Sequence, residues 1–195
     1  MSVVIVVACP QRAERSLLAG AMSCPHCSGR LRPHGHGRRR TVRGLNDTRL
    51  SVTPRRAECA DCGRTQILLS AALTARRADS TEVIGAALAA KVAGAGRRSI
   101  AARLGRPVST VRNWLRRVPE PHAQWLWQRA VQRAVAVDRE LLAGPLVQQS
   151  TLAHALNLLA GAALRYRQRF SLADAPWALM CFFADGRLLA PPPFS

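Results

Sequence analysis

The chain has 195 residues, enough for one compact domain or for two or three small modules in series. It carries 29 lysines and arginines against 11 aspartates and glutamates, a formal net charge of +18, and such a surface attracts polyanions, of which nucleic acid is the commonest. The sequence has no run of about 18 apolar residues, so it predicts a cytoplasmic protein without a membrane-spanning helix.

The residue pattern divides the chain into four segments. Residues 1–22 contain an apolar run, Val3–Val7, that predicts a buried strand, and then a weakly helical stretch. Residues 23–78 are rich in glycine, arginine and turn residues, with short alternating pieces, such as RTVRG at 40–44 and TRLSV at 48–52, that predict small strands. Residues 79–118 predict three short helices, and residues 119–195 predict further helices. Gly144, followed by Pro145, is expected to end the first of these further helices, and Asp174 is expected to cap the last. The expected fold is mainly α with a small β ribbon.

Four of the six cysteines form two C-x2-C pairs, Cys24 with Cys27 and Cys59 with Cys62. Two such knuckles, joined by short strands, can present four thiolates tetrahedrally to one Zn²⁺ ion. A glycine follows each pair within two residues, where a knuckle turn needs a relaxed backbone. The alternative is a redox dithiol, which is expected at the start of a helix in a βαβ unit that this segment lacks. The spacing therefore predicts a zinc ribbon with a structural zinc ion.

Three histidines of this segment, and two unpaired cysteines elsewhere in the chain, have side chains that can also bind metal ions. His26, His34 and His36 are alternative zinc ligands, although four cysteines already complete the coordination shell. Cys9 and Cys181 lie in apolar surroundings and are interpreted as buried small hydrophobic residues. The arginines of the segment far exceed what a metal site needs, which leaves most of them for phosphates. They are Arg30, Arg38, Arg39, Arg40, Arg43, Arg55, Arg56 and Arg64.

Residues 97–116, RRSIAARLGRPVSTVRNWLR, carry the sharpest pattern in the chain. They predict two short helices: Gly105 ends the first, Val108 fills the turn and Ser109 caps the second. The inward positions are small or apolar, as a close helix crossing requires. They are Ile100, Ala101, Leu104, Val111 and Trp114.

The outward positions of this motif are polar or basic, and no acidic residue lies between Glu82 and Glu120. A generic helical hairpin would mix both signs of charge. The pattern predicts a helix-turn-helix whose polar, amide and guanidinium groups face the base edges and phosphates of double-stranded DNA. The expected DNA-binding residues are Arg97, Arg98, Arg106, Ser109, Thr110, Arg112, Asn113, Arg116 and Arg117.

The succession of knuckle, basic strands, second knuckle and trihelical helix-turn-helix resembles the N-terminal DNA-binding region of zinc-ribbon insertion-sequence transposases, over roughly residues 22–118. It also resembles short helix-turn-helix proteins of unassigned function from high-GC bacteria. The resemblance implies that the four paired cysteines are the zinc ligands and that residues 109–116 form the recognition helix. The chain departs from the transposases because their catalytic domain is missing.

No enzymatic activity is expected. A transposase gathers three carboxylates on an RNase-H-like sheet to hold two metal ions, whereas the acidic residues after Arg117 lie on or beside predicted helices. They are Glu120, Asp138, Glu140, Asp174 and Asp185. No site for a small-molecule substrate is evident either.

The leading hypothesis is a sequence-specific DNA-binding protein with structural zinc, either a transcriptional regulator or a transposase-derived remnant. The alternative is a non-catalytic RNA-binding or scaffold protein that uses the basic zinc ribbon. Binders of RNA and single strands rely on aromatic stacking, and residues 23–113 contain no Phe, Tyr or Trp, which favours duplex DNA.

The aromatic load of residues 122–184 predicts a homodimer that buries the surplus apolar surface, with an internal core as the alternative. The residues concerned are Trp125, Trp127, Trp177, Phe182 and Phe183.

Overall fold

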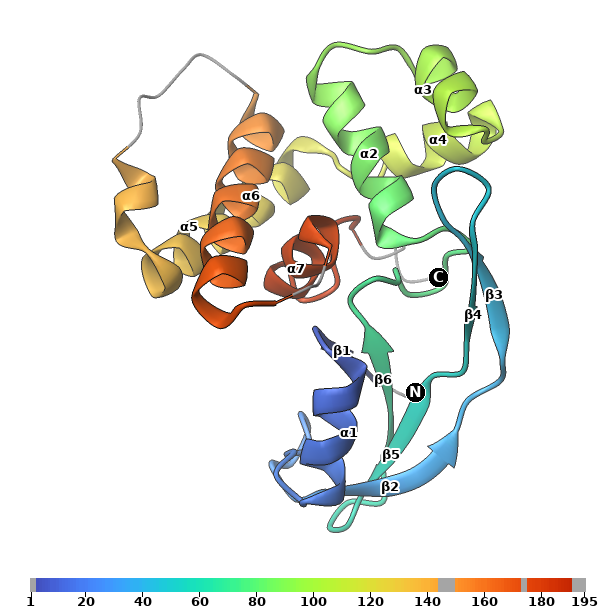
Figure 1. Ribbon diagram of the computed structural model, residues 1–195, viewed down its shortest axis with the longest axis vertical. Helices are drawn as coiled ribbons and strands as arrows, with labels where there is room; N and C mark the ends of the chain where they lie inside the picture. Colours follow the sequence, from blue (N-terminus) through green and yellow to red (C-terminus); the bar gives the residue numbers. More distant parts are fainter. Residues whose placement is uncertain (1–2, 144–149, 173–174, 191–195) are drawn as a thin grey trace.

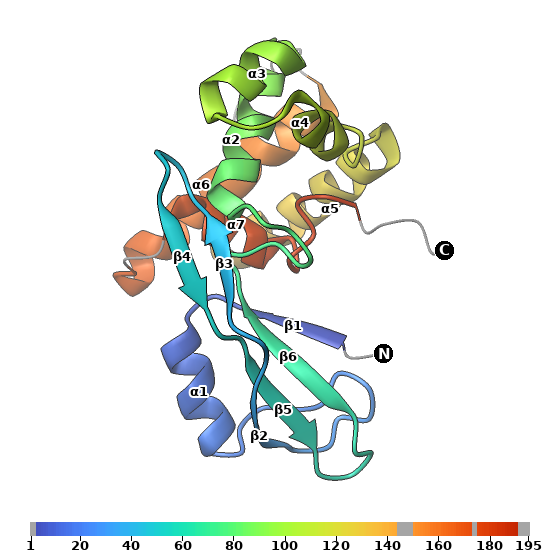
Figure 2. The ribbon, with the colours of Figure 1, turned by 90° about the vertical axis from the view of Figure 1, so that its right-hand side faces the viewer.

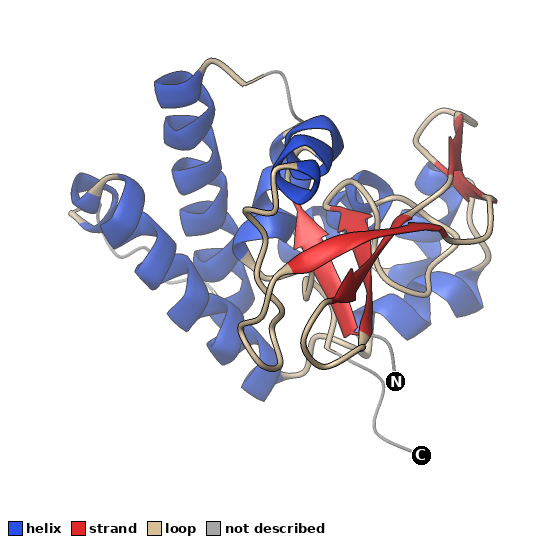
Figure 3. Cartoon of the chain, turned by 90° about the horizontal axis from the view of Figure 1, so that it is seen from below, coloured by secondary structure: helices blue, strands red, loops and turns tan. Residues whose placement is uncertain are grey.

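The computed structural model describes residues 3–143, 150–172 and 175–190. These residues form seven α-helices, one short 3-10 helix and six strands in two sheets. Figure 1 shows the main sheet below, with the N-terminal helix beside it and the other helices above it; Figure 3 shows the helices and strands from below. The expectation of a mainly α fold is corrected to a mixed one, because the strands build a four-stranded sheet in addition to a two-stranded ribbon.

The four-stranded sheet joins the N-terminal strand to the cysteine segment. Its order is β1 (Val3–Val7), β6 (Thr65–Ser70), β5 (Arg55–Cys59) and β2 (Leu31–His36). The predicted strand β1 is confirmed, and it runs parallel to β6, whereas β5 is antiparallel to both of its neighbours. Helix α1 (Pro10–Leu18) packs against this sheet over a small core. That core consists of Val7, Ala13, Leu17, Cys24, Leu31, Ala57, Cys59 and Leu68.

A hairpin of β3 (Arg40–Arg43) and β4 (Arg49–Val52) rises from the sheet toward the helices, as Figure 2 shows. Both strands were predicted from their alternating pattern. Val42 is 1% exposed and packs with Val52 against Leu69 and Leu73, at the end of β6 and just beyond it. The hairpin therefore has one apolar face that fixes it to the rest of the chain.

Three short helices follow: α2 (Thr81–Val92), α3 (Arg97–Leu104) and α4 (Val108–Leu115). Ser80 caps α2, because its hydroxyl accepts a hydrogen bond of 3.4 Å from the amide of Val83. The three helices contact one another, and their inward side chains belong to the main core.

The remaining helices are α5 (Glu120–Val137), a 3-10 turn at Arg139–Leu142, α6 (Thr151–Phe170) and α7 (Pro176–Phe183). The helix predicted to run to Gly144 ends instead at Val137, because Asp138 is extended and caps the 3-10 turn. Gly144, Pro145 and the predicted cap Asp174 lie outside the described residues. No helix within the described ranges is long and apolar enough to cross a membrane.

The aromatic side chains expected at a dimer interface are engaged within one chain. Phe183 is 3% exposed and meets Tyr166 edge-on, with ring centroids 5.4 Å apart. Trp125, Trp127, Trp177 and Phe182 are partly buried and pack against the main core. The homodimer is therefore not supported, because an internal core already covers the apolar surface that suggested it.

Gly85 allows α7 to approach α2 closely. A Cβ atom at this position would collide with the Trp177 ring. We expect Gly85→Ala to lower the free energy of unfolding by about 2 kcal/mol, because overpacking outweighs the better helix propensity of alanine. Thermal unfolding of the full chain should show a Tm about 4–8 °C lower.

Gly37→Ala is the matched control, because the nearest atom to its added Cβ lies at an ordinary 3.6 Å. A Tm for Gly85→Ala equal to that of Gly37→Ala would show that α2 and α7 separate without cost.

Candidate metal centre and nucleic-acid interface

The four paired cysteines converge at one end of the four-stranded sheet. Their Sγ atoms all lie within 4.8 Å of one another, and no other group of this kind occurs among the described residues. The Sγ atom of Cys24 lies 3.9 Å from that of Cys62, and Cys27 lies 3.4 Å from Cys59. Four sulfurs at about 2.3 Å around a tetrahedral Zn²⁺ ion would be about 3.8 Å apart. The spacing thus fits a four-cysteine zinc site and is too long for disulfides.

The two knuckles share one backbone geometry. The amide of Ser28 donates to the carbonyl of Cys24 at 2.9 Å, and that of Gly63 donates to the carbonyl of Cys59 at 3.1 Å. Both donor residues have positive φ, 61° at Ser28 and 65° at Gly63. The relaxed backbone predicted for the second knuckle is confirmed at Gly63, whereas in the first knuckle Ser28 takes this conformation in place of Gly29.

The sheet brings the knuckles together although 31 residues separate the two pairs in sequence. Leu31 pairs with Cys59 across β2 and β5, and the amide of Ala60 donates to the carbonyl of Arg30 at 2.9 Å. Cys24 and Cys59 are each 2% exposed and belong to the core beneath α1. The cluster is therefore part of that core.

The four thiols influence one another's protonation because their sulfurs are in contact. The pKa of Cys24 is lowered to about 7, chiefly because the amide of His26 donates to its sulfur at 3.4 Å. The Gly29 amide acts in the same direction on Cys27, yet hydrogen bonds with Cys59 and other thiols of the cluster raise its pKa to about 12. A divalent cation would stabilise all four thiolates together.

The other candidate ligands lie outside this cluster. His34 Nδ1 is 3.1 Å from the Glu58 carboxylate, and His36 lines a cavity beside α1. Cys181 is buried, and burial raises the pKa of its thiol to about 11, as expected for a small hydrophobic residue. Cys9 is only half-buried, so its interpretation as a buried residue is wrong in degree.

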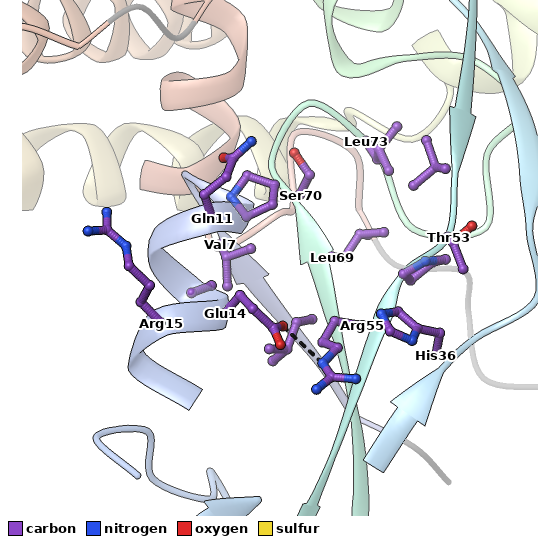
Figure 4. Close-up of a pocket in the computed structure, with 15 residues that line it drawn as sticks. Val7, Gln11, Glu14, Arg15, His36, Thr53, Arg55, Leu69, Ser70 and Leu73 are labelled. Carbon is purple, nitrogen blue, oxygen red and sulfur yellow. Dashed lines mark ion pairs between the residues drawn. The ribbon is translucent and has the colours of Figure 1, made fainter. Parts of the chain in front are cut away.

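The cavity beside α1 has a volume of about 490 Å³ and lies between α1, β6 and the base of the hairpin. Figure 4 shows Arg55 between Glu14 and His36, and its Nε lies 2.9 Å from the Glu14 carboxylate. Arg55 was among the arginines expected to be free for phosphates. Its side chain is instead engaged in this ion pair.

Helix α4 carries an exposed polar face. Ser109, Arg112, Asn113 and Arg116 are all exposed and recur at spacings of three and four residues, which places them on one side of the helix. In the described part of the chain, no carboxylate forms an ion pair with the arginines of α3 or with those at 112 and 116. Their charge is available to an anionic partner.

The inward half of the motif is largely as predicted. Ile100, Ala101, Val111 and Trp114 are at most 3% exposed. Gly105 ends α3 in the left-handed conformation, with φ 60° and ψ 40°.

Two local expectations about the turn are wrong. The second helix begins at Val108, so Pro107 and not Ser109 is at the N-cap position. Val108 is 41% exposed and does not fill the turn.

The flanking residues differ in exposure. Arg97 and Arg98 are exposed in the first turn of α3, and Thr110 is half-buried on α4. Arg117 is half-buried, and its guanidinium donates to the carbonyl of Ala190 at 3.3 Å. Arg117 is thus partly committed to the C-terminal segment.

Arg106 differs from the exposed residues of the expected DNA-binding set because it is bound within the chain. Its side chain is 6% exposed, and its Nε donates to a carboxylate oxygen of Asp79 at 2.6 Å. Its Nη2 donates to the carbonyl of Gly44 in the hairpin at 2.7 Å, and its Nη1 to that of Leu104 at 3.0 Å. Four of the five N–H groups of this guanidinium thus have acceptors within the chain, so the side chain holds the α3–α4 turn.

The role of Asp79 at this junction was not predicted from the sequence. Asp79 also accepts hydrogen bonds from Arg43, the closer at 2.8 Å, so one carboxylate joins the hairpin to the α3–α4 turn. A signal was present, because Asp79 is the only acidic residue between Asp61 and Glu82. A lone carboxylate among arginines is a candidate for a buried ion pair.

Comparison with known proteins bears on the helices alone. No curated protein and no solved structure matches the chain significantly. Residues 76–121, about a quarter of the chain, match the model of the homeodomain-like domain of the helix-turn-helix class. This match spans α2, α3 and α4 and fits a DNA-binding region of the kind found in transposases.

Proposed function

We propose that the protein binds double-stranded DNA in a sequence-specific manner, with α4 in the major groove. The observation that carries this proposal is the exposed polar and basic face of α4 inside the segment that matches a homeodomain-like domain. A major groove about 12 Å wide admits one α-helix, and side chains on its exposed face then meet the base edges.

The residues divide into two groups by chemistry. Arg112 and Asn113 are assigned to base edges, since arginine pairs with guanine and asparagine with adenine in a bidentate manner. Ser109 and Arg116 flank them on the same face. Phosphate contacts, which carry no sequence information, are assigned to the arginines at the helix ends. These are Arg97, Arg98 and, within the limits set by its contact with Ala190, Arg117.

We infer that the four-cysteine cluster holds Zn²⁺ in a structural role. All four ligand positions would be filled by Cys24, Cys27, Cys59 and Cys62, which leaves no open position for a substrate. The ion would stabilise the fold of the cysteine-containing segment, residues 23–70, and take no part in chemistry.

This function places the protein in the cytoplasm, on the chromosome, as a transcriptional regulator or as a transposase-derived DNA-binding remnant. A catalytic role is not proposed. Among the described carboxylates after residue 117, Asp138 pairs with Arg165, Asp185 pairs with Arg133, and Glu120 accepts a hydrogen bond from Thr151. The two proposed roles differ in whether loss of the protein changes transcription beside its binding sites.

The test is selection of bound duplexes from a random pool, followed by binding measurements on two variants. Asn113→Ala should lose preference for the selected site, by roughly 1–3 kcal/mol, and keep weak general binding. Arg98→Ala should weaken binding to all duplexes by the same factor and reduce the salt dependence by about one unit.

An equal loss of specific and random binding in Asn113→Ala would mean that α4 is not the reading helix. The basic zinc ribbon would then be the better candidate. Tighter binding to single-stranded RNA than to the selected duplex would reject the proposed function altogether.

A further inference from the structure

The β3–β4 hairpin lies beside the α3–α4 turn, as Figures 1 and 2 both show. Backbone hydrogen bonds of 2.8 Å join Arg43 to Ala78 and to Ser80, so the end of β3 is hydrogen-bonded to the residues just before α2. The Asp79 carboxylate then binds Arg43 from the hairpin and Arg106 from the turn. The hairpin and the three helices are thus fixed to one another by buried charge.

This junction brings the hairpin close to the reading helix. Arg106 donates to the carbonyl of Gly44, the residue that follows β3, and α4 begins two residues after Arg106, at Val108. The end of the hairpin consequently lies near the N-terminal end of α4. A duplex seated on α4 would pass beside it.

The hairpin presents a polar face that includes an unpaired arginine. The register pairs Thr41 with Ser51 and Arg43 with Arg49, so these four side chains share the face opposite Val42. Arg49 is exposed, and no carboxylate of the described residues forms an ion pair with it. Its neighbour Arg43 is already committed to Asp79, so Arg49 is the free positive charge at this end of the hairpin.

The charge of the turn between β3 and β4 limits which part of the hairpin can contact DNA. Asn46 and Asp47 form the turn with positive φ, and both are exposed. A carboxylate is repelled by phosphate, so the turn itself is unsuited to enter a groove. The strand flank at Arg49 has the right charge and is the part that can lie along a backbone.

We propose that the β3–β4 hairpin is a second DNA-contacting element, which binds the phosphate backbone next to the site read by α4 through Arg49. This inference rests on the proposed function and extends it. The contact carries no base information but sets the register of α4 on the duplex. Asp79 is the positioning residue, because it holds the hairpin against the turn.

The experiment uses the full chain loaded with zinc and the duplex selected from a random pool. Phosphate ethylation interference should show two groups of sensitive phosphates on the wild-type complex. Arg49→Ala should lose the group beyond the N-terminal end of α4 and bind selected and random duplexes about fivefold more weakly at 0.15 M salt. Its salt slope should fall by about one unit. Arg49→Lys should restore the slope, because it keeps the charge.

Arg12→Ala is the matched control. It removes one positive charge from an exposed position on α1, at the opposite end of the molecule from α3 and α4 (Figure 1). An Arg49→Ala protein indistinguishable from Arg12→Ala, while Asn113→Ala still loses site preference, would overturn the hairpin inference and leave the proposed function standing. A wild-type protein that selects no duplex would overturn both.

Discussion

Cys59→Ser is expected to abolish binding of the proposed zinc ion and to unfold the core beneath α1. Cys59 is 2% exposed and contributes both a sulfur to the cluster and a side chain to that core. The core contains few other buried residues, so folding of residues 23–70 should depend on the metal, whose apparent binding free energy in structural sites is about 10–16 kcal/mol. Metal analysis should show that the zinc content falls from one ion per chain to none.

Limited proteolysis gives the structural readout of the same change. Cleavage should concentrate within residues 23–70, whereas the helical core built from α2 to α7 should keep its circular dichroism, because its buried residues form a separate cluster. Cys9→Ser is the control, since Cys9 lies outside the cluster and should retain one zinc. Full zinc retention by Cys59→Ser would refute the ligand assignment.

Asp79→Ala is expected to lower the free energy of unfolding by about 3–5 kcal/mol. The substitution leaves the Arg106 guanidinium buried without its counter-charge, and removing one partner of a buried pair costs this much. Arg43 loses the same carboxylate, so the hairpin loses one of its polar links to the helices. Denaturant unfolding of the zinc-loaded chain measures the effect.

Glu82→Ala is the control for Asp79→Ala. It removes an exposed carboxylate three residues further along, in the first turn of α2, and should cost less than about 1 kcal/mol. Asp79→Asn should fall between the two, because its amide oxygen still accepts one hydrogen bond. If Asp79→Ala unfolds like Glu82→Ala, water reaches Arg106 and the ion pair does not hold the hairpin in place.

The local sequence determined the features that depend on near neighbours. Paired cysteines predicted the two knuckles, alternation predicted β3 and β4, and Gly105 predicted the end of α3. The buried positions of the motif, such as Ile100 and Trp114, also followed from helical spacing. In each case the preference arises from the backbone conformation or the periodicity of a few neighbouring residues, and both can be read from the local sequence.

Tertiary structure alone decided which distant residues meet. Val3 pairs with Gln66, although the apolar run at residues 3–7 does not indicate which strand it pairs with. Arg106 resembles the other basic residues of its motif in sequence, and only the positions of Asp79 and Gly44 make it a buried structural group while Arg49 stays free. An arginine binds whichever carboxylate or phosphate the fold brings within reach, so its role is set by packing and not by its neighbours in the chain.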